Sequence, residues 1–295
     1  MSSDATTGFG LVGTLGRDRV EGQSRRIGAR WARGANRVWT VSRKGLGAVI
    51  AAAALPVLLL ALWHLTAQRQ WVSSLILPPP SEVWRTFREL LSDGTIAGNL
   101  GISAMRVAKG FAAGGMLGLG LGTALGLSAS CRAYLQPTFI SLTQVNILGW
   151  IPLLILVFGI DEPLKLAAIA WATFLPVTFN TMQGIAGIAP KWFELARVYQ
   201  VRPRDVICKV ALPAALPSLF TGIRSGLGAA WMSLVLVELV ASSEGIGFMV
   251  VWGRQLFQLD LVFVAIIVIG VVGLALDGLL RAVEWRLRRW HGALA

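Results

Sequence analysis

Long uncharged stretches, separated by short charged ones, set the main constraint on what this chain can fold into. Asp, Glu, Lys and Arg are all missing from residues 45–68, 110–131, 133–160 and 166–181. A helix that crosses a bilayer needs about 20 predominantly apolar residues. Only 14% of the chain is charged, whereas soluble domains carry roughly a quarter. The sequence therefore predicts a membrane protein.

The uncharged stretches predict an all-α membrane protein with six transmembrane helices. The expected spans are residues 46–66, 99–127, 134–158, 164–182, 218–240 and 259–280, within a transmembrane domain over 46–285. Between the first two spans, Pro78 to Pro80 predict a turn, and Ser81 is the expected N-cap of a short surface helix that ends near residue 95.

The distribution of basic residues predicts which side of the membrane each segment faces. Most of the 27 Lys and Arg residues fall in four segments that six spans place on the side of the termini: residues 1–45, 128–134, 186–217 and 281–295. Basic residues accumulate on the cytoplasmic side of membrane proteins. We therefore expect both termini in the cytoplasm and the chain in a bacterial inner membrane.

The net charge of +12 raises the question of nucleic-acid binding, but the positive-inside pattern explains it without such a partner. Residues 1–45 hold nine basic residues and few large aliphatic ones, which predicts a largely disordered cytoplasmic tail. Residues 286–295 form a second basic end. Cys131 and Cys208 lack any metal-binding or disulfide spacing, and only His64 and His291 could supply an imidazole, so we expect neither a metal site nor a catalytic site.

The expected second span carries four glycines at strict four-residue spacing. Gly114, Gly118, Gly122 and Gly126 share one helix face. Small residues let the backbones of two membrane helices approach closely. The stripe therefore predicts a helix-packing face.

The segment 186–217 is too long for a simple turn and too apolar for a solvated linker. Its first part places Trp192, Leu195, Ala196 and Tyr199 on one face of a short helix. After Pro203, the apolar residues Val206, Ile207, Val210 and Ala211 follow at helical spacing. Two short amphipathic helices on the cytoplasmic face would lie either on lipid or in a groove of a partner protein, and the periodicity leaves both open.

The same segment resembles the EAA loop of ABC-importer permeases. Glu194 and Ala196, followed by Val210 and Leu212-Pro213, match the spacing of that motif. Leu195 stands where the motif has its first Ala, and Gln200 stands at the usual Gly, which leaves the tight turn between the two short helices unexplained. Further matches run over about residues 70–290. They are Leu77 to Val83, Phe158 to Glu162, Phe174-Leu175-Pro176 and Ser243 to Gly247.

Together these motifs look like the nitrate, sulfonate, taurine and bicarbonate branch of type I ABC importers, with aliphatic-sulfonate permeases nearest in look. The resemblance implies a homodimer of permeases, two ATPase subunits that grip the coupling loop, and a periplasmic binding protein. The sequence has no GxxxxGK[ST] phosphate loop, so ATP and Mg²⁺ are expected on the ATPase and no catalysis on this chain. The residues expected to couple to the ATPase are Trp192, Glu194, Leu195, Ala196, Tyr199, Gln200, Pro203, Ile207, Leu212 and Pro213.

Ionisable residues within a span are costly and are functional candidates. Arg224 and Glu238 either reach their own membrane interfaces or, for Arg224, attract an anionic solute into the pathway. Asp277 and Arg281 have the spacing of a helical ion pair. Residues expected at the pathway wall are Asn146, Trp150, Trp171, Arg224 and Trp231, although a tryptophan is more often a packing or interface residue.

The outer segment from Ser242 to Gln258 contains Glu244, Trp252 and Arg254. It forms either a gate and docking surface for the binding protein or a plain re-entrant loop. The function that fits the whole sequence is import of a small anionic solute driven by ATP. An importer of another small organic solute, or an ATP-independent transporter or channel, stays as the alternative, although the latter gives the amphipathic loop no use.

Overall fold

The computed structural model describes residues 54–291, without the side chains of residues 197, 203, 204, 285 and 287–291. The chain divides into two compact units, Met1–Trp71 and Val72–Ala295. In the first unit the described part contains the apolar helix Ala54–Gln68. The expected basic tail, the start of the first expected span and residues 292–295 lie outside the described residues.

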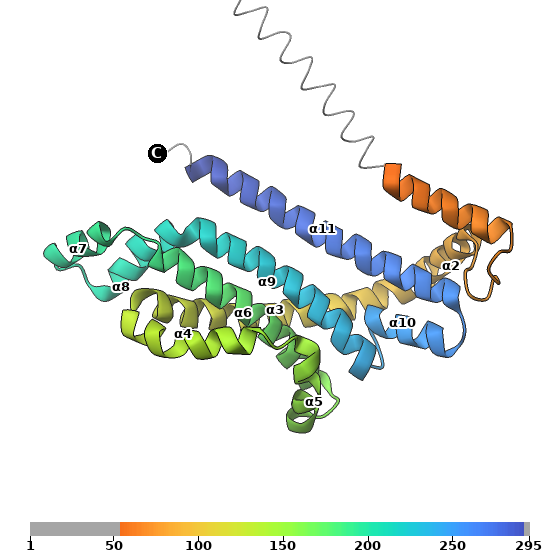
Figure 1. Ribbon diagram of the computed structural model, residues 1–295, viewed down its shortest axis with the longest axis horizontal. Coiled ribbons are helices and arrows are strands. Elements are labelled where there is room, and N and C mark those ends of the chain that lie inside the picture. The colour runs from red at the N-terminus through yellow and green to blue at the C-terminus, as the bar shows by residue number, and fades with distance from the viewer. Residues whose placement is uncertain (1–53, 292–295) are drawn as a thin grey trace, which may run out of the picture. The chain divides into compact units, whose positions relative to one another are not determined.

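Helices make up all of the secondary structure described in the second unit (Figure 1). Figure 1 shows α7 and α8 at one end of this unit and α2 and α10 at the other. The elements are α2 Pro80–Ser92, α3 Thr95–Leu127, α4 Ala129–Thr143, α5 Ile147–Phe158, α6 Glu162–Ala186, α7 Pro190–Val198, α8 Pro203–Val206, the π-helical turn η1 Ile207–Ala211, α9 Leu212–Ala241, α10 Ile246–Gln255 and α11 Leu259–His291.

The glycine stripe of α3 lies directly against α6. A Cβ atom added to Gly114 would stand 2.1 Å from the carbonyl oxygen of Ala170, and one added to Gly122 would stand 2.6 Å from Cβ of Thr181. Gly118 and Gly126 contact Val177 and Ile185 of α6 in the same way. These distances leave no room for a side chain, so the two backbones are in close contact along the stripe.

A neighbouring side of α6 is covered by α9, again through glycines. A Cβ atom at Gly222 would stand 2.9 Å from Cβ of Asn180, and one at Gly226 would stand 2.9 Å from Val177. Three polar side chains of α6 bond within the helix: Thr173, Thr178 and Asn180 each donate to the carbonyl four residues earlier. An interior helix whose polar side chains bond in this way does not need a uniformly apolar surface.

The sequence predicted one continuous span over residues 134–158, and this prediction is wrong because the chain breaks within it. The chain forms two helices, α4 and α5, which meet at 98°. The side chain of Asn146 accepts a hydrogen bond from the backbone N–H of Leu148 at 3.0 Å. This is an N-cap interaction, and it starts a new helix at Ile147.

Three stretches of the described chain are long and apolar enough to cross a membrane: Thr95–Leu127, Ile207–Gln255 and Leu259–Glu284. The bent pair α4 and α5 makes a fourth. Six spans were expected, and two of them do not meet this length and hydropathy. The described part of the helix Ala54–Gln68 is short, and α6 carries polar residues.

Two helices begin earlier than the sequence indicates. Helix α2 begins at Pro80, with Pro79 as its N-cap and no capping side chain, so the expectation that Ser81 caps this helix is wrong. A missing N–H costs nothing in the first turn of a helix, where Pro80 lies. Helix α9 begins at Leu212 rather than near residue 218, and it continues directly from the π-helical turn η1.

The packing of α3 on α6 predicts opposite effects for two glycine substitutions in α3. Gly114→Ala should lower the thermal stability of the detergent-solubilised protein, because overpacking of a close contact costs about 1–3 kcal/mol. Gly120→Ala is the matched control, since a Cβ atom there meets nothing within 4 Å. It should leave the melting temperature unchanged or raise it, because alanine favours a helix over glycine by about 1 kcal/mol. Equal melting temperatures for the two variants would contradict this packing.

Candidate functional site

Helix α7 presents a row of large apolar side chains to the outside. Trp192, Leu195 and Tyr199 are 50%, 48% and 71% exposed, and Val198 is exposed as well. Glu194 lies among them and is exposed too. Of the face expected from the periodicity, Ala196 alone is buried. A contiguous apolar surface of this kind marks an interaction site.

The other side of this loop is anchored in the helical core. Phe193 and Leu212 pack against a buried group that contains Ile185 of α6 and Ala215 of α9. Ala211, at the end of η1, is fully buried in the same group. A force on the exposed face of α7 is therefore transmitted to α6 and α9.

Gln200 takes the backbone conformation that glycine usually takes at the end of a helix. Its φ is +50°, in the left-handed region where side chains other than glycine are disfavoured. The N–H of Val201 donates to the carbonyl of Ala196 at 2.9 Å. This six-to-one hydrogen bond is that of a Schellman motif, so the tight turn after α7 forms although the glycine is absent.

The second short helix differs from the expectation. Helix α8 has four residues and is followed by the five-residue π-helical turn η1, which leads without interruption into α9. Ile207 is partly buried and Pro213 is exposed, whereas the side chain of Pro203 lies outside the described residues. An ion pair of 2.8 Å between Lys209 and Asp205 holds the turn on its exposed side. Short π-helical segments are rare and often occur at functional sites.

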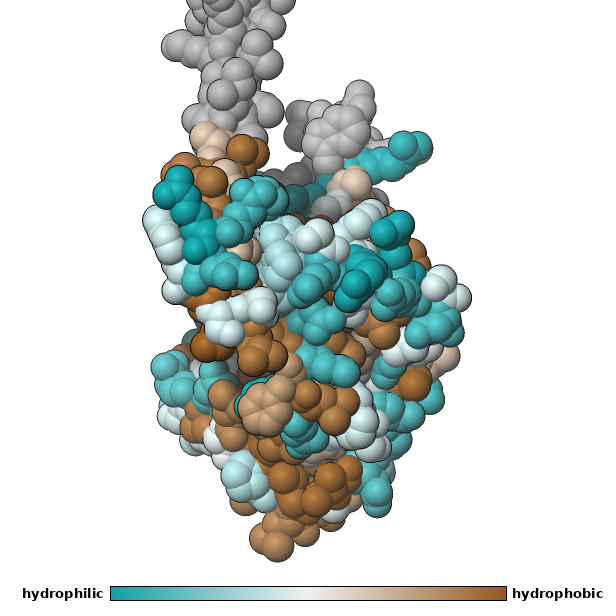
Figure 2. All heavy atoms as spheres, turned by 90° about the vertical axis from the view of Figure 1, so that its right-hand side faces the viewer, coloured by the Kyte–Doolittle hydropathy of each residue, from teal (hydrophilic) through white to brown (hydrophobic). Residues whose placement is uncertain are grey.

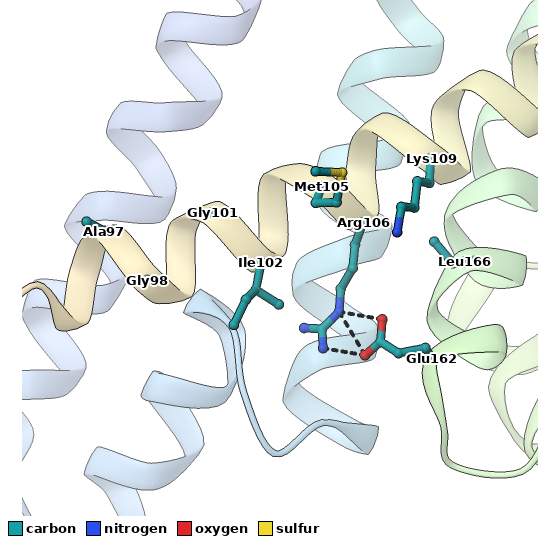
Figure 3. Close-up of a pocket in the computed structure, with 9 residues that line it drawn as sticks. All are labelled: Ala97, Gly98, Gly101, Ile102, Met105, Arg106, Lys109, Glu162 and Leu166. Carbon is teal, nitrogen blue, oxygen red and sulfur yellow. Dashed lines mark hydrogen bonds and ion pairs between the residues drawn. The ribbon is translucent and has the colours of Figure 1, made fainter.

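At the opposite end of the unit, a buried arginine joins three helices. Arg106 of α3 is 2% exposed, and its Nη1 donates to Glu238 of α9 at 2.9 Å. Its Nε donates to Glu162 of α6 at 3.0 Å, as Figure 3 shows. Nη1 and Nη2 also reach the carbonyl and the carboxylate of Glu244 at 2.9 and 3.1 Å. We call these four residues the Arg106 cluster.

Glu238 is the fully buried member of the Arg106 cluster. It accepts hydrogen bonds from Ser103 at 2.8 Å and from the backbone N–H of Gly247 at 2.9 Å. A Cβ atom at Gly245, whose φ is +107°, would stand 2.3 Å from the Glu238 carboxylate, and one at Gly247 would stand 2.6 Å from its Cβ. The motif Ser243 to Gly247 therefore has glycines where a buried carboxylate touches the backbone.

The expectation that Glu238 reaches the outer membrane interface is wrong, because Arg106 balances its charge inside the protein. Arg106 lies within the expected second span, and no expectation from the sequence paired it with Glu238. A carboxylate within an apolar stretch does indicate a buried partner. However, the partner lies 132 positions away, and no local pattern connects the two.

Two members of the Arg106 cluster, Arg106 and Glu162, border a cavity of about 490 Å³. Gly101, Ile102 and Lys109 also line it (Figure 3). Glu162 precedes the apolar part of α6 and is half exposed. Its hydrogen bonds with Arg106 lower its pKa to about 2, and a further bond from Lys165 acts in the same direction. This carboxylate therefore stays ionised at physiological pH.

The three residues expected at the outer gate are divided between two places. Glu244 belongs to the Arg106 cluster, whereas Trp252 is half exposed and lies against Phe248 with ring centroids 5.8 Å apart. Arg254 is exposed near the end of α10. Figure 2 looks onto this end of the unit, where hydrophilic and hydrophobic side chains are interspersed.

Arg224 is bound by carboxylates of α11. It donates to Asp277 at 2.9 Å and to Glu284 at 3.3 Å, and Asp277 also pairs with Arg281 at 2.8 Å. The sequence did not indicate these two carboxylate partners, and the expected place of Arg224 at the pathway wall stays a prediction. The nearby Trp231 is buried and donates to the carbonyl of Ile269 at 3.2 Å, so it joins α9 to α11.

The remaining wall residues gather around the break between α4 and α5. Asn146 caps α5, and Trp150 of α5 meets Trp171 of α6 with ring centroids 5.2 Å apart. Phe174 stacks on Trp171 at 5.9 Å. The three rings border an apolar cavity of about 430 Å³.

Comparison with known proteins defines the class to which these sites belong. Residues 114–289 match the family described as binding-protein-dependent transport system inner membrane component. The match covers more than half of the chain, so the chain belongs to this family. It is the permease component of a binding-protein-dependent ABC importer and a multi-pass protein of the inner membrane, and it is a transport subunit rather than an enzyme.

Three relatives describe its branch of the family. A putative aliphatic sulfonates transport permease of Bacillus subtilis is 42% identical over 239 residues, which are 81% of this chain and 87% of the relative. The taurine transport permease of Escherichia coli is 34% identical over 79% of this chain and 87% of its own length. The bicarbonate transport permease of Synechococcus elongatus is 35% identical over 64% of this chain and 66% of its own length.

The Arg106 cluster predicts a large loss of stability when its charges become unbalanced. Arg106→Ala should cost about 3–5 kcal/mol, because it leaves the buried Glu238 without its cation. The double change Arg106→Met with Glu238→Gln removes both charges and should recover most of that loss. Arg85→Ala, which breaks the exposed pair with Glu89, is the control and should cost less than about 1 kcal/mol. Thermal unfolding in detergent measures all three, and a mild effect of Arg106→Ala would refute the buried pair.

The turn after α7 predicts that Gln200→Gly stabilises the loop. The left-handed conformation costs a non-glycine residue about 1–2 kcal/mol. Glycine avoids this cost, but it loses roughly 0.5–1 kcal/mol more conformational entropy on folding because its unfolded chain is more flexible. The net gain should therefore stay below about 1.5 kcal/mol. Gln200→Val should destabilise the same turn, because a β-branched residue fits this region least. Amide hydrogen exchange of residues 190–201 distinguishes the two variants, and faster exchange in the glycine variant would rule out the strained turn.

Proposed function

We propose that this chain forms, with a second copy, the pathway through which an ATP-driven importer moves a small anionic solute into the cell. The solute is a sulfonate, taurine, bicarbonate, nitrate or a similar oxyanion. Two ATPase subunits bind the two coupling loops, and ATP and Mg²⁺ bind to those subunits. A periplasmic binding protein delivers the solute to the end of the molecule that carries α2 and α10.

The exposed apolar face of α7 is the observation that carries this proposal. Trp192, Leu195 and Tyr199 are large side chains that are about half or more exposed, on a loop whose other face packs against α6 and α9. Lipid could cover such a face, but a lipid surface would not need the rigid attachment. A partner protein that binds the loop in a groove and moves it does need this rigid attachment.

Six spans and cytoplasmic termini are part of the proposal. Helix α6 is covered by α3 and α9 through their glycines, and an interior helix can cross the membrane with less apolar character than one that faces lipid. The helix Ala54–Gln68 supplies the described part of the first span. The basic segment 186–217 then faces the cytoplasm, which is the side on which an ATPase meets its ATP.

The names of the relatives support an anionic solute. Proteins named for transport of aliphatic sulfonates, taurine and bicarbonate match most of the chain. These solutes share an oxyanion group and small size, and the proposal is confined to what they share.

The proposed coupling surface predicts loss of ATPase binding when α7 is made smaller. The double variant Leu195→Ala with Tyr199→Ala should reduce the amount of co-expressed ATPase that purifies with the permease by roughly tenfold or more, because truncation of such interface anchors costs about 2 kcal/mol or more. Leu156→Ala, at a position 85% exposed on α5, is the matched control and should bind ATPase normally.

Uptake of radiolabelled taurine into proteoliposomes that contain permease, ATPase and binding protein gives the functional readout. The α7 variant should lose both ATPase binding and uptake. Permease that transports at the normal rate without any bound ATPase would refute the proposal.

A further inference from the structure

Helix α2 has an apolar surface that is wider than its contact with the rest of the protein. With about 3.6 residues per turn, five apolar side chains fall within about a third of its circumference, in the order Leu90, Val83, Phe87, Leu91 and Trp84. We call these five residues the apolar arc. At one edge of the arc Val83 is buried and Leu90 is partly buried, whereas Leu91 and Trp84 at the other edge are 53% and 59% exposed. The protein thus covers one side of the arc and leaves the other side open.

The rest of the circumference of α2 is polar. It carries Ser81, Glu82, Arg85, Thr86, Arg88, Glu89 and Ser92. Arg88 follows Trp84 by one turn and therefore lies at the open edge of the apolar arc. Arg85 pairs with Glu89 at 3.7 Å, whereas Arg88 is exposed and forms no ion pair with a described residue. A helix with Trp, Phe and Leu on one face and charged residues on the other is typical of helices that lie in the surface of a bilayer.

One hydrogen bond fixes the height of α2 along α11. Thr86 donates to Asp260 at 2.6 Å, and Asp260 is the second residue of α11. Residues 261–276, which follow it, carry no charge, so the part of α11 that can lie in hydrocarbon begins there. Figure 1 shows α2 beside this end of α11. Helix α2 therefore lies where this span meets the bilayer surface, at the end of the unit opposite to α7.

We propose that α2 lies in this bilayer surface and binds phospholipid. Trp84 and Leu91 enter the layer between the headgroups and the acyl chains, which is the place that tryptophan favours in membrane proteins. The side chain of Arg88 extends along the open edge of the apolar arc, and its guanidinium binds a lipid phosphate. Because Thr86 is bonded to Asp260, the same contact keeps the first turn of α11 at the bilayer surface.

Phospholipid fits this face better than water or a transient protein partner. Leu75 and Ile76, which precede α2, are exposed as well, so the apolar surface does not end with the helix. In water such a surface would be an aggregation site. A partner that binds and leaves would return this face to water each time, whereas lipid is always present at this height of a membrane protein. An apolar edge followed by an arginine also matches a bilayer, in which phosphates lie above the acyl chains.

Spin labels on the two faces of α2 test the contact in the full chain, reconstituted in nanodiscs of phosphatidylethanolamine and phosphatidylglycerol. Both native cysteines are exposed and are replaced by serine. The labelled positions are Trp84→Cys and Leu91→Cys on the apolar arc, with Glu82→Cys and Glu89→Cys as matched controls on the polar face. Electron paramagnetic resonance measures how often each label collides with O₂, which dissolves in lipid, and with a nickel chelate, which stays in water. The ratio of the two rates should be severalfold higher on the apolar arc than on the polar face.

The variant Arg88→Glu tests the phosphate contact. A carboxylate at this position is repelled by the lipid phosphates, so the collision ratio of the label at residue 91 should fall toward that at residue 89. Arg254→Glu makes the same change of charge at an exposed position of α10, and it should leave the ratio at residue 91 unchanged. Equal ratios in the two variants would overturn the role of Arg88.

Trp84 reports the same contact without a label on the helix. In the complete complex with ATPase and binding protein, grown with 5-fluorotryptophan, the fluorine resonance that is lost in Trp84→Phe should broaden when the lipids carry a nitroxide close to the headgroup. The resonance that is lost in Trp231→Phe should broaden much less, because Trp231 is buried.

Two patterns of collision rates would overturn the proposal. High rates with the nickel chelate at all four positions would place α2 in water. Low rates with both reagents at residues 84 and 91 would place the open edge of the apolar arc against another protein segment or a second copy. A Trp84 resonance that does not respond to the nitroxide lipid would overturn the proposal as well, even where a cysteine variant fails to fold.

Discussion

The close contact of α6 with α3 and α9 is the constraint on which the rest of the molecule depends. In a bilayer, helices gain nothing from leaving a lipid surface for one another's apolar surface, so packing and backbone approach must hold them together. Gly114 and Gly122 of α3, and Gly222 of α9, provide that approach. The same three helices supply Arg106, Glu162 and Glu238 at one end of the unit. At the other end, the loop that contains α7 and α8 connects α6 with α9. The same three packed helices therefore connect the Arg106 cluster with the loop that contains α7 and α8.

Much of this core follows from local patterns in the sequence. The four-residue glycine spacing predicted a close neighbour for α3, and α6 is that neighbour. The helix over residues 99–127 was placed within a few residues, since α3 begins at Thr95 and ends at Leu127. The pair Asp277 and Arg281 follows from helical spacing alone. Such features depend on residues that are near one another in the chain, and a single sequence contains them.

The features that were missed depend on distant residues or on the backbone. Glu238 and Arg106 lie in different helices, so the sequence showed two isolated charges and not a pair. The break at Asn146 was missed because residues 133–160 carry no charge, so the stretch was taken as one span although an uncharged side chain caps a new helix there. Gln200 shows the reverse case. The sequence indicated that the turn lacked its glycine, whereas the six-to-one hydrogen bond to Ala196 holds the glutamine in the glycine conformation. A residue type favours certain backbone conformations, but the contacts around the residue decide which conformation it takes.

The contact between Glu238 and the two glycines of the outer loop also limits how this protein can change during evolution. Gly245 and Gly247 have no room for a side chain while the carboxylate stands against them. Neither position is free to vary alone, and Glu238 cannot be exchanged for a larger residue. A lineage that shortened residue 238 would release both glycines together and would at the same time remove the fully buried carboxylate partner of Arg106. The four positions should therefore be inherited as a block, and sequences of this branch should differ at all of them or at none.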